Sequence, residues 1–221
     1  MNRLREALRR RGDDSGMSLT ELIVAMGIFS VVVVIFMAGV VVMTKNTARA
    51  QAVGDSGDAA LKIFQRLDKE VRYSSGINAG GAGTTAGTYY VEYLITAVDA
   101  GTQPKCVQWR YSSATHKLDR RTWPNVSAPT ASAWLTMATT VRNDLTDTTQ
   151  RPFVFQKADD TNVNQRLVVH LDLGYGAANG KRGASIDSVF VARNTSKLSQ
   201  SNNLNGAGAN VTPVCNQLGR P

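Results

Sequence analysis

Residues with side chains suited to catalysis are few and scattered. The two histidines are His116, in a polar stretch typical of a turn, and His170, in an alternating segment where Asp172 shares its face of a strand. An aspartate beside a histidine can orient a general base. However, no serine or cysteine stands in a recognisable nucleophile setting. We therefore predict no catalytic residues and a protein that is not an enzyme.

The sequence also lacks motifs for metals and cofactors. There is no HExxH, no P-loop and no GxGxxG after a predicted strand. The adjacent acids Asp159 and Asp160, and the nearby pair Asp144 and Asp147, lack the ligand spacing of a calcium loop. We expect no cofactor, no metal site and no cofactor-binding residues.

The two cysteines, Cys106 and Cys215, offer a different chemistry. Neither belongs to a CxxC or to a Cys/His pair at zinc spacing. In an exported domain they would form one structural disulfide, and in the cytosol they would be two buried thiols. They are a candidate disulfide that would tie the C-terminal segment to the rest of the domain.

The charged residue with the most unusual surroundings is Glu21, the single charge between Met17 and Met43. A carboxylate inside a membrane costs about 2.5–3.5 kcal/mol on insertion scales, and residues kept there are usually functional. Glu21 lies near the start of the apolar run, where reaching the membrane interface would lower that cost. This residue alone therefore leaves two explanations open: Glu21 is a carboxylate that reaches the membrane interface, or it is kept for a function.

The apolar run itself predicts a membrane-spanning helix over residues 17–43. It exceeds the length of about 20 residues that spans a bilayer, and it is too long for an ordinary secretory signal. Residues 1–16 are polar and contain Arg9, Arg10 and Arg11, which place the N-terminus in the cytoplasm.

The helix is predicted to continue over residues 44–76 as an amphipathic segment. The apolar stripe recurs every three or four residues: Ala60, Phe64, Leu67 and Val71. Charges four residues apart predict three weak pairs: Asp58 with Lys62, Arg66 with Glu70, and Asp68 with Arg72. Gly54 and Gly57 predict a bend or an end to the first half of this helix. A glycine-rich loop, 77–88, then stops it.

Residues 89–221 contain short aromatic and β-branched segments separated by polar stretches. These patterns predict a β-rich domain with a C-terminal loop, in which 134–141 is either a strand or a short helix. The predicted fold class is α+β. A long N-terminal transmembrane helix continues into an amphipathic helix packed on an antiparallel sheet, and the domain lies outside the membrane.

The N-terminal sequence GMSLTEL (16–22), followed by the long apolar helix, resembles the prepilin leader of type IV pilins and type II secretion pseudopilins. The resemblance implies a pilin-like fold, with residues 1–16 as a cytoplasmic leader. Prepilin peptidase would cleave between Gly16 and Met17 and methylate the new amine of Met17. Phe is usual in the family where Met17 stands.

The resemblance also gives Glu21 a role. Cleavage leaves a cationic amine beside the membrane, and the carboxylate of a neighbouring subunit can offset its cost. A buried ion pair is sensitive to misplacement, so Glu21 would set the register between subunits. The implied partners are other pilins or pseudopilins, prepilin peptidase, an inner-membrane assembly platform and membrane lipid. The protein would be a single-pass protein of the bacterial cytoplasmic membrane with an extracytoplasmic C-terminal domain.

A weaker similarity extends into the domain. The segments 61–78, 107–123 and 190–194 are similar to J-type minor pseudopilins. A net charge of +8 suits anionic partners. Arginines also interleave with tryptophans and tyrosines between 89 and 134, a composition that can bind single-stranded nucleic acid. A DNA- or surface-binding minor pilin is therefore the alternative, although snorkelling arginines on a half-buried sheet explain the same pattern.

Overall fold

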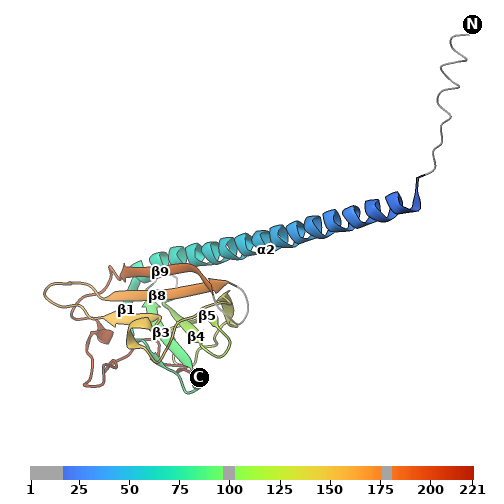
Figure 1. Cartoon of the computed structure of the whole chain (residues 1–221). Helices are drawn as coiled ribbons and strands as arrows, with labels where there is room; N and C mark the ends of the chain where they lie inside the picture. The colour runs from blue at the N-terminus through green and yellow to red at the C-terminus, as the bar shows by residue number, and fades with distance from the viewer. Residues whose placement is uncertain (1–16, 97–102, 176–180) are drawn as a thin grey trace, which may run out of the picture. The chain divides into compact units, whose positions relative to one another are not determined.

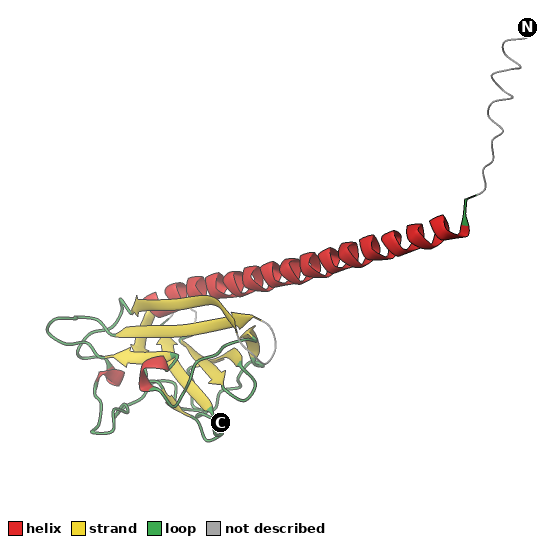
Figure 2. Cartoon of the chain, in the orientation of Figure 1, coloured by secondary structure: helices red, strands yellow, loops and turns green. Residues whose placement is uncertain are grey.

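The computed structural model describes residues 17–96, 103–175 and 181–221. In these ranges one long helix, α2 (Leu19–Arg72), is followed by strands and two short 3-10 turns (Figures 1 and 2). The chain divides into two compact units, residues 1–48 and 49–221. The first contains the apolar part of α2, and the second contains the rest of the helix with all the described strands. The α+β class predicted from the sequence is confirmed.

The strands form two antiparallel sheets. The first sheet has the order β1-β3-β4-β5-β6, with β2 paired to β3 at its end. Its strands are β1 (Ser74–Ile77), β2 (Gly81–Ala82), β3 (Thr88–Ile95), β4 (Lys105–Ser112), β5 (Lys117–Pro124) and β6 (Leu135–Ala138). The second sheet contains β7 (Phe153–Gln156), β8 (Arg166–Tyr175) and β9 (Lys181–Val191). The segment 134–141, left open between strand and helix, thus contains an edge strand. The 3-10 turns are η1 (Thr148–Gln150) and η2 (Gln200–Asn202).

One hydrophobic core joins the helix to both sheets. The buried residues of α2 are Ser56, Ala60, Ile63, Leu67 and Val71, which recur at helical spacing. The predicted stripe had Phe64 in place of Ile63. Phe64 lies at the edge of this face, 40 % exposed, with its ring centroid 5.3 Å from that of Phe190 on β9. Ile63 is fully buried in its place.

The helix ends earlier than the sequence pattern indicated, and it does not break at Gly54 or Gly57. It stops at Arg72, and residues 74–77 pair with β3 instead of completing the helix. The Ser74 hydroxyl donates a hydrogen bond of 2.7 Å to the Val71 carbonyl, which satisfies one of the free acceptors at the helix end. Serine and glycine follow at 75 and 76, and both favour leaving a helix.

The glycine-rich loop is held against the sheets at close range. A Cβ atom at Gly80 would collide with the backbone carbonyl of Phe153, and one at Gly83 would collide with the ring of Tyr90. Glycine is required at both positions because the backbone passes too close for a side chain. Close packing against the sheets therefore explains why the loop has glycine at these two positions.

The helix and the first sheet are also joined by a buried ion pair. Arg120 on β5 donates to both carboxylate oxygens of Glu70, at 2.6 and 3.2 Å. The Tyr93 hydroxyl donates to the same carboxylate at 2.6 Å and accepts from the Trp109 indole at 2.8 Å. The predicted pair between Arg66 and Glu70 is therefore wrong, because Glu70 faces the sheet.

Of the other two predicted pairs, the one between Asp68 and Arg72 forms at 2.6 Å. Asp58 and Lys62 form no ion pair among the described residues.

Alkaline pH should destabilise the domain through its buried phenols. Burial, with a smaller contribution from the Asp144 charge, raises the pKa of Tyr111 from 10.0 to about 12. Because the folded pKa exceeds the unfolded one, this contribution to stability is complete below pH 10.0 and is lost as the pH rises toward about 12. Burial, followed by the Glu70 charge, also raises the pKa of Tyr93.

We expect Tyr111→Phe to lose about 1 kcal/mol at neutral pH, through its hydrogen bond to the Asn143 carbonyl, and to show a shallower alkaline decline. Denaturant titrations followed by tryptophan fluorescence at pH 8 to 12 would measure both effects. If the stability of the wild-type protein and of Tyr111→Phe fell in parallel with rising pH, the alkaline decline would not come from Tyr111.

Candidate functional site

The start of α2 is a capping box. Met17 and Ser18 precede the helix, which begins at Leu19. The Glu21 backbone N–H donates to the Ser18 hydroxyl at 3.3 Å, and the Ser18 N–H donates to Glu21 Oε2 at 3.4 Å. This reciprocal arrangement satisfies two of the backbone donors left free at a helix N-terminus. Glu21 therefore has a role within its own chain, at the first turn of the helix.

The capping box had a sequence signal that our first interpretation of Glu21 did not use. Serine followed by glutamate three positions later, at the start of an apolar run, is the usual pattern of this motif. Both hydrogen bonds are long, and Glu21 and Ser18 are exposed. The second carboxylate oxygen of Glu21, Oε1, makes no hydrogen bond among the described residues. The cap therefore leaves the carboxylate accessible to a cation.

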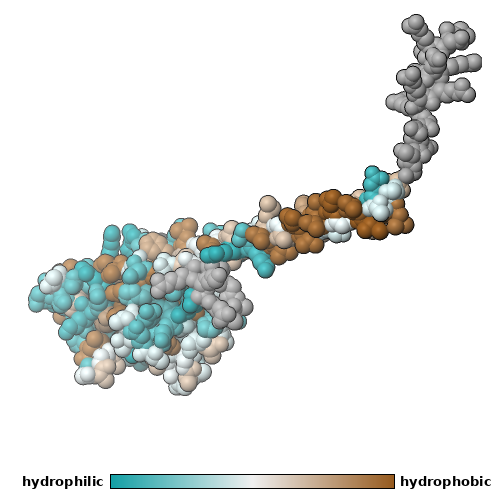
Figure 3. Space-filling model, viewed as in Figure 1, coloured by the Kyte–Doolittle hydropathy of each residue, from teal (hydrophilic) through white to brown (hydrophobic). Residues whose placement is uncertain are grey.

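After the cap, α2 presents apolar side chains on every side. Almost all residues from 17 to 50 are exposed, and up to residue 43 the large apolar ones other than the half-buried Val33 are between 41 and 75 % exposed. Figure 3 shows this surface as a continuous apolar band on the N-terminal part of the helix. α2 is the one helix among the described residues that is long and apolar enough to cross a membrane. A surface of this kind is stable only in lipid or against other apolar helices.

These features define the class: a protein anchored by one apolar N-terminal helix, which has a serine as its N-cap and is followed by a β-rich domain. Residues 11–37 match the family model of the prokaryotic N-terminal methylation motif. No curated protein and no solved structure matches the chain. The match is consistent with a type IV pilin or pseudopilin, and it indicates a structural subunit that prepilin peptidase processes. It also indicates membrane anchoring and association with other pilins.

The residues predicted for cleavage, methylation and subunit register belong to this N-terminal part of the sequence. Gly16 lies outside the described residues, whereas Met17 and Glu21 flank the start of α2. The motif match ends before the segments that carry the J-type similarity, which stays a prediction.

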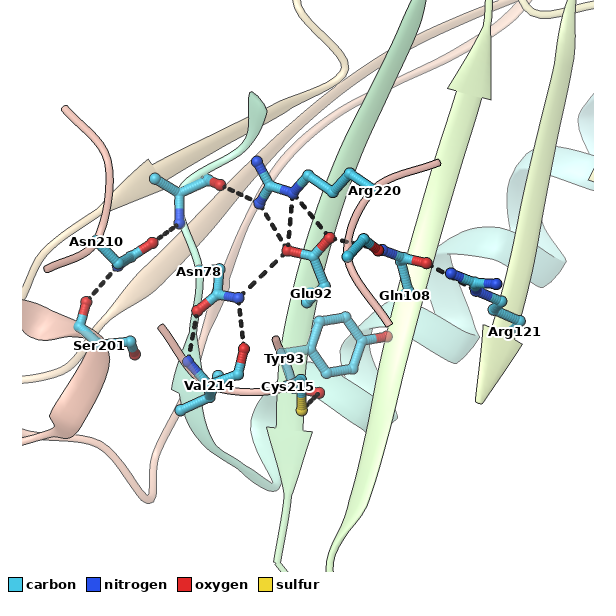
Figure 4. A network of polar contacts seen from close by, with 12 residues as sticks. Asn78, Glu92, Tyr93, Gln108, Arg121, Ser201, Asn210, Val214, Cys215 and Arg220 are labelled. Atoms are coloured by element: carbon cyan, nitrogen blue, oxygen red, sulfur yellow. Dashed lines mark hydrogen bonds and ion pairs between the residues drawn. The ribbon is translucent and has the colours of Figure 1, made fainter. Parts of the chain in front are cut away.

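The other candidate region is the outer face of the first sheet, which carries a buried polar network (Figure 4). Glu92 on β3 is at its centre. Arg220 donates to both Glu92 oxygens, with the shortest contact at 2.6 Å. Gln108 donates to Glu92 at 2.8 Å and accepts from Arg121 at 2.7 Å, while Asn78 donates to Glu92 at 3.2 Å. Both oxygens of the carboxylate are occupied by neighbours from the same chain, so we assign this network a structural role.

The disulfide lies beside this network. Cys106 on β4 and Cys215 in the C-terminal segment are bonded, with the Sγ atoms 2.06 Å apart. Gln108 donates to the Gly219 carbonyl at 2.9 Å, and the Tyr90 hydroxyl donates to the carbonyl of Pro221. Covalent and polar contacts together fasten residues 214–221 onto the sheet. The Cys106–Cys215 bond leaves no free cysteine in the chain.

The histidines are separate from both regions. His116 occupies the turn between β4 and β5, with φ of 55° and Nδ1 3.1 Å from the Val141 carbonyl oxygen. His170 lies on β8, and its Nδ1 is 3.0 Å from Asp187, directly opposite on β9. Both contacts are local and structural. The Asp144 and Asp147 carboxylates accept hydrogen bonds from Thr146 and Thr149 in their own turns. Within the described residues, no group of three or more metal-ligating side chains forms.

The interleaved aromatic residues are mostly inside the domain. The residues at most 7 % exposed are Tyr89, Tyr90, Tyr93, Trp109, Tyr111 and Trp123. Trp134 is half-buried between the guanidinium groups of Arg110 and Arg121, which lie 4.2 and 4.4 Å from its ring. Six of these rings are therefore buried in the domain, and the half-buried Trp134 is covered in part by two arginines.

Proposed function

We propose that the chain is a minor pilin or pseudopilin. In this proposal it is a structural subunit of a type IV pilus or a type II secretion pseudopilus, which assembles through α2 after cleavage between Gly16 and Met17. The capping box at Ser18 and Glu21 carries the proposal. It stands directly after the proposed cleavage position and at the head of an exposed apolar helix, within the matched motif.

In the proposed assembly, apolar helices of neighbouring subunits cover the exposed surface of α2. The methylated amine of Met17 on one subunit lies beside Glu21 of the next, whose Oε1 has no intrachain hydrogen bond among the described residues. Away from water, an unpaired amine or carboxylate is costly, so only the correct stagger satisfies both. The geometric precision comes from the charges, and most of the contact area comes from the apolar side chains.

The domain would then lie outside the cytoplasmic membrane, with the N-terminus in the cytoplasm. The Cys106–Cys215 bond supports this placement, because structural disulfides persist in oxidising compartments. Prepilin peptidase, other pilins, the assembly platform and membrane lipid are the proposed partners. The J-type pattern lies on the end of α2 and on β1, on β4 and β5 and at the end of β9, and we retain it as the proposed subtype.

Co-expression with prepilin peptidase tests the processing step. We expect the mass of the membrane-extracted N-terminal peptide to correspond to a chain that starts at Met17 and carries one added methyl group. Gly16→Val should abolish cleavage, because the position before the cut would carry a β-branched side chain. An intact N-terminus starting at Met1 in the wild-type chain would refute the proposed processing.

The role of Glu21 needs a variant that separates charge from capping. Glutamine also serves at the third position of a capping box, so Glu21→Gln keeps the cap and removes the charge. Ser18→Ala removes the cap and keeps the charge. We expect Glu21→Gln to reduce incorporation into filaments by at least about tenfold, the effect of about 1.4 kcal/mol, and Ser18→Ala to reduce it much less. Immunoblots of sheared filaments measure incorporation. A larger loss for Ser18→Ala than for Glu21→Gln would show that Glu21 acts only as part of the helix cap.

A further inference from the structure

The domain has a positively charged groove between the last turns of α2 and the first sheet. It encloses about 740 Å³ and lies over the helix-facing side of β5 and β6. Besides Arg120, which is paired with Glu70, its cations are four: Lys62, Arg66 and Lys69 on the helix and Lys105 at the start of β4. All four are exposed. We refer to this surface as the basic groove.

The charge of the basic groove is not neutralised by ion pairs within the part of the chain that the structure describes. None of the four cations forms an ion pair among the described residues. Among the described residues, the one carboxylate that lines the groove is Glu70, and it is already held by Arg120 and Tyr93. The sequence predicted an ion pair between Arg66 and Glu70, but in the structure Arg66 is exposed to solvent. The described residues of the groove walls therefore offer these four cations no free counter-charge.

The groove also contains apolar side chains between the cations. Leu135 and Tyr73 are 52 and 43 % exposed, and Ile95 and Met137 are partly buried beside them. A nucleic-acid backbone would pair with the cations but would gain little from the aliphatic groups, and Tyr73 is the one aromatic ring in the lining. A segment with acidic residues on one side and apolar residues on the other satisfies both parts of the surface.

We propose that the basic groove binds an acidic amphipathic segment of a partner protein. If the proposed function is correct, that partner is a neighbouring pilin-like subunit, and this inference rests on it for the identity of the partner. The apolar residues of the segment would cover Leu135 and Met137. Its carboxylates would reach Lys62, Arg66 and Lys69, which lie at helical spacing along α2. Long-range electrostatic attraction between the carboxylates and the cations would speed association, and the apolar contacts would slow dissociation.

The test uses the full chain in nanodiscs of zwitterionic lipid and a fluorescent synthetic helix with leucines on one face and glutamates on the other. We expect the triple variant Lys62→Glu/Arg66→Glu/Lys69→Glu to weaken binding by about tenfold or more, because it reverses the complementary charge. The matched control is Lys117→Glu/Arg142→Glu/Lys157→Glu. It changes the net charge equally at exposed cations outside the groove lining, and it should retain binding. Leu135→Ser should weaken binding without changing charge.

Four outcomes would overturn the proposal. Equal losses in the two triple variants would show a general charge effect. Equal binding of a peptide with lysines in place of glutamates would show apolar adhesion only. Stronger binding of a single-stranded DNA oligonucleotide, or loss of peptide binding in nanodiscs with phosphatidylglycerol, would assign the cations to nucleic acid or lipid. Peptide binding needs neither cleavage after Gly16 nor Glu21, so its failure is distinguishable from failure of the proposed function.

Discussion

Replacing Glu70 by alanine is expected to destabilise the domain by about 3–5 kcal/mol, the usual cost of removing one partner from a buried ion pair. The Arg120 and Glu70 side chains are only 9 and 13 % exposed, so water cannot replace the lost carboxylate well. The Tyr93 hydroxyl would lose its acceptor in the same substitution. Denaturant titration of the full chain, followed by the fluorescence of the buried Trp109 and Trp123, would measure the change.

Two arginines provide the matched comparison for this prediction. Arg120→Ala should cost about as much as Glu70→Ala, because it leaves the carboxylate buried and unpaired. Arg66→Ala removes the partner that helical spacing predicts for Glu70, and it should change the free energy of unfolding by less than about 0.5 kcal/mol, as is usual for exposed side chains. Equal costs for Arg66→Ala and Arg120→Ala would contradict the observed pairing.

The Glu70 pairing shows where sequence reasoning was insufficient. Helical spacing identifies every residue that can reach Glu70 along the helix, but it contains no information about a strand fifty residues away. The buried face of α2 was predicted well at Ala60, Leu67 and Val71, because the period of the helix alone determines it. The choice between Ile63 and Phe64 depended on where β9 lies, and only the tertiary structure supplies that.

A similar limit applies to the two sheets. Short segments of aromatic and β-branched residues predicted most of the strands, since strand patterns are local. The division into two sheets, and the use of residues 74–77 as a strand, depend on pairings between distant segments. The contact of Arg220 with Glu92 joins the C-terminal segment to β3, and no local pattern indicates it. At the N-terminus the information is local, so Glu21 could be singled out and its capping partner Ser18 was also within reach.

Removal of the disulfide is the second change with a large expected effect. The bond closes a loop with a sequence separation of 109 residues between Cys106 and Cys215. In the chain-entropy model, a loop of about 100 residues contributes about 4.7 kcal/mol at 25 °C, and losses of about 2–5 kcal/mol are typical. We expect the double variant Cys106→Ala/Cys215→Ala to unfold at clearly lower denaturant concentration. Reduced wild-type protein should behave similarly.

The disulfide and the polar network act on the same C-terminal segment, and their contributions can be separated. Arg220→Ala removes the ion pair to Glu92 but leaves the covalent loop intact, so its cost comes only from native-state contacts. The disulfide acts mainly on the unfolded chain, which it restricts. A double-mutant cycle of Arg220→Ala with Cys106→Ala/Cys215→Ala should therefore give nearly additive losses if the network keeps the segment in place without the bond. Losses far from additive would show that the bond is needed to hold Arg220 against Glu92. Unchanged stability after reduction would show that the polar contacts alone hold the segment.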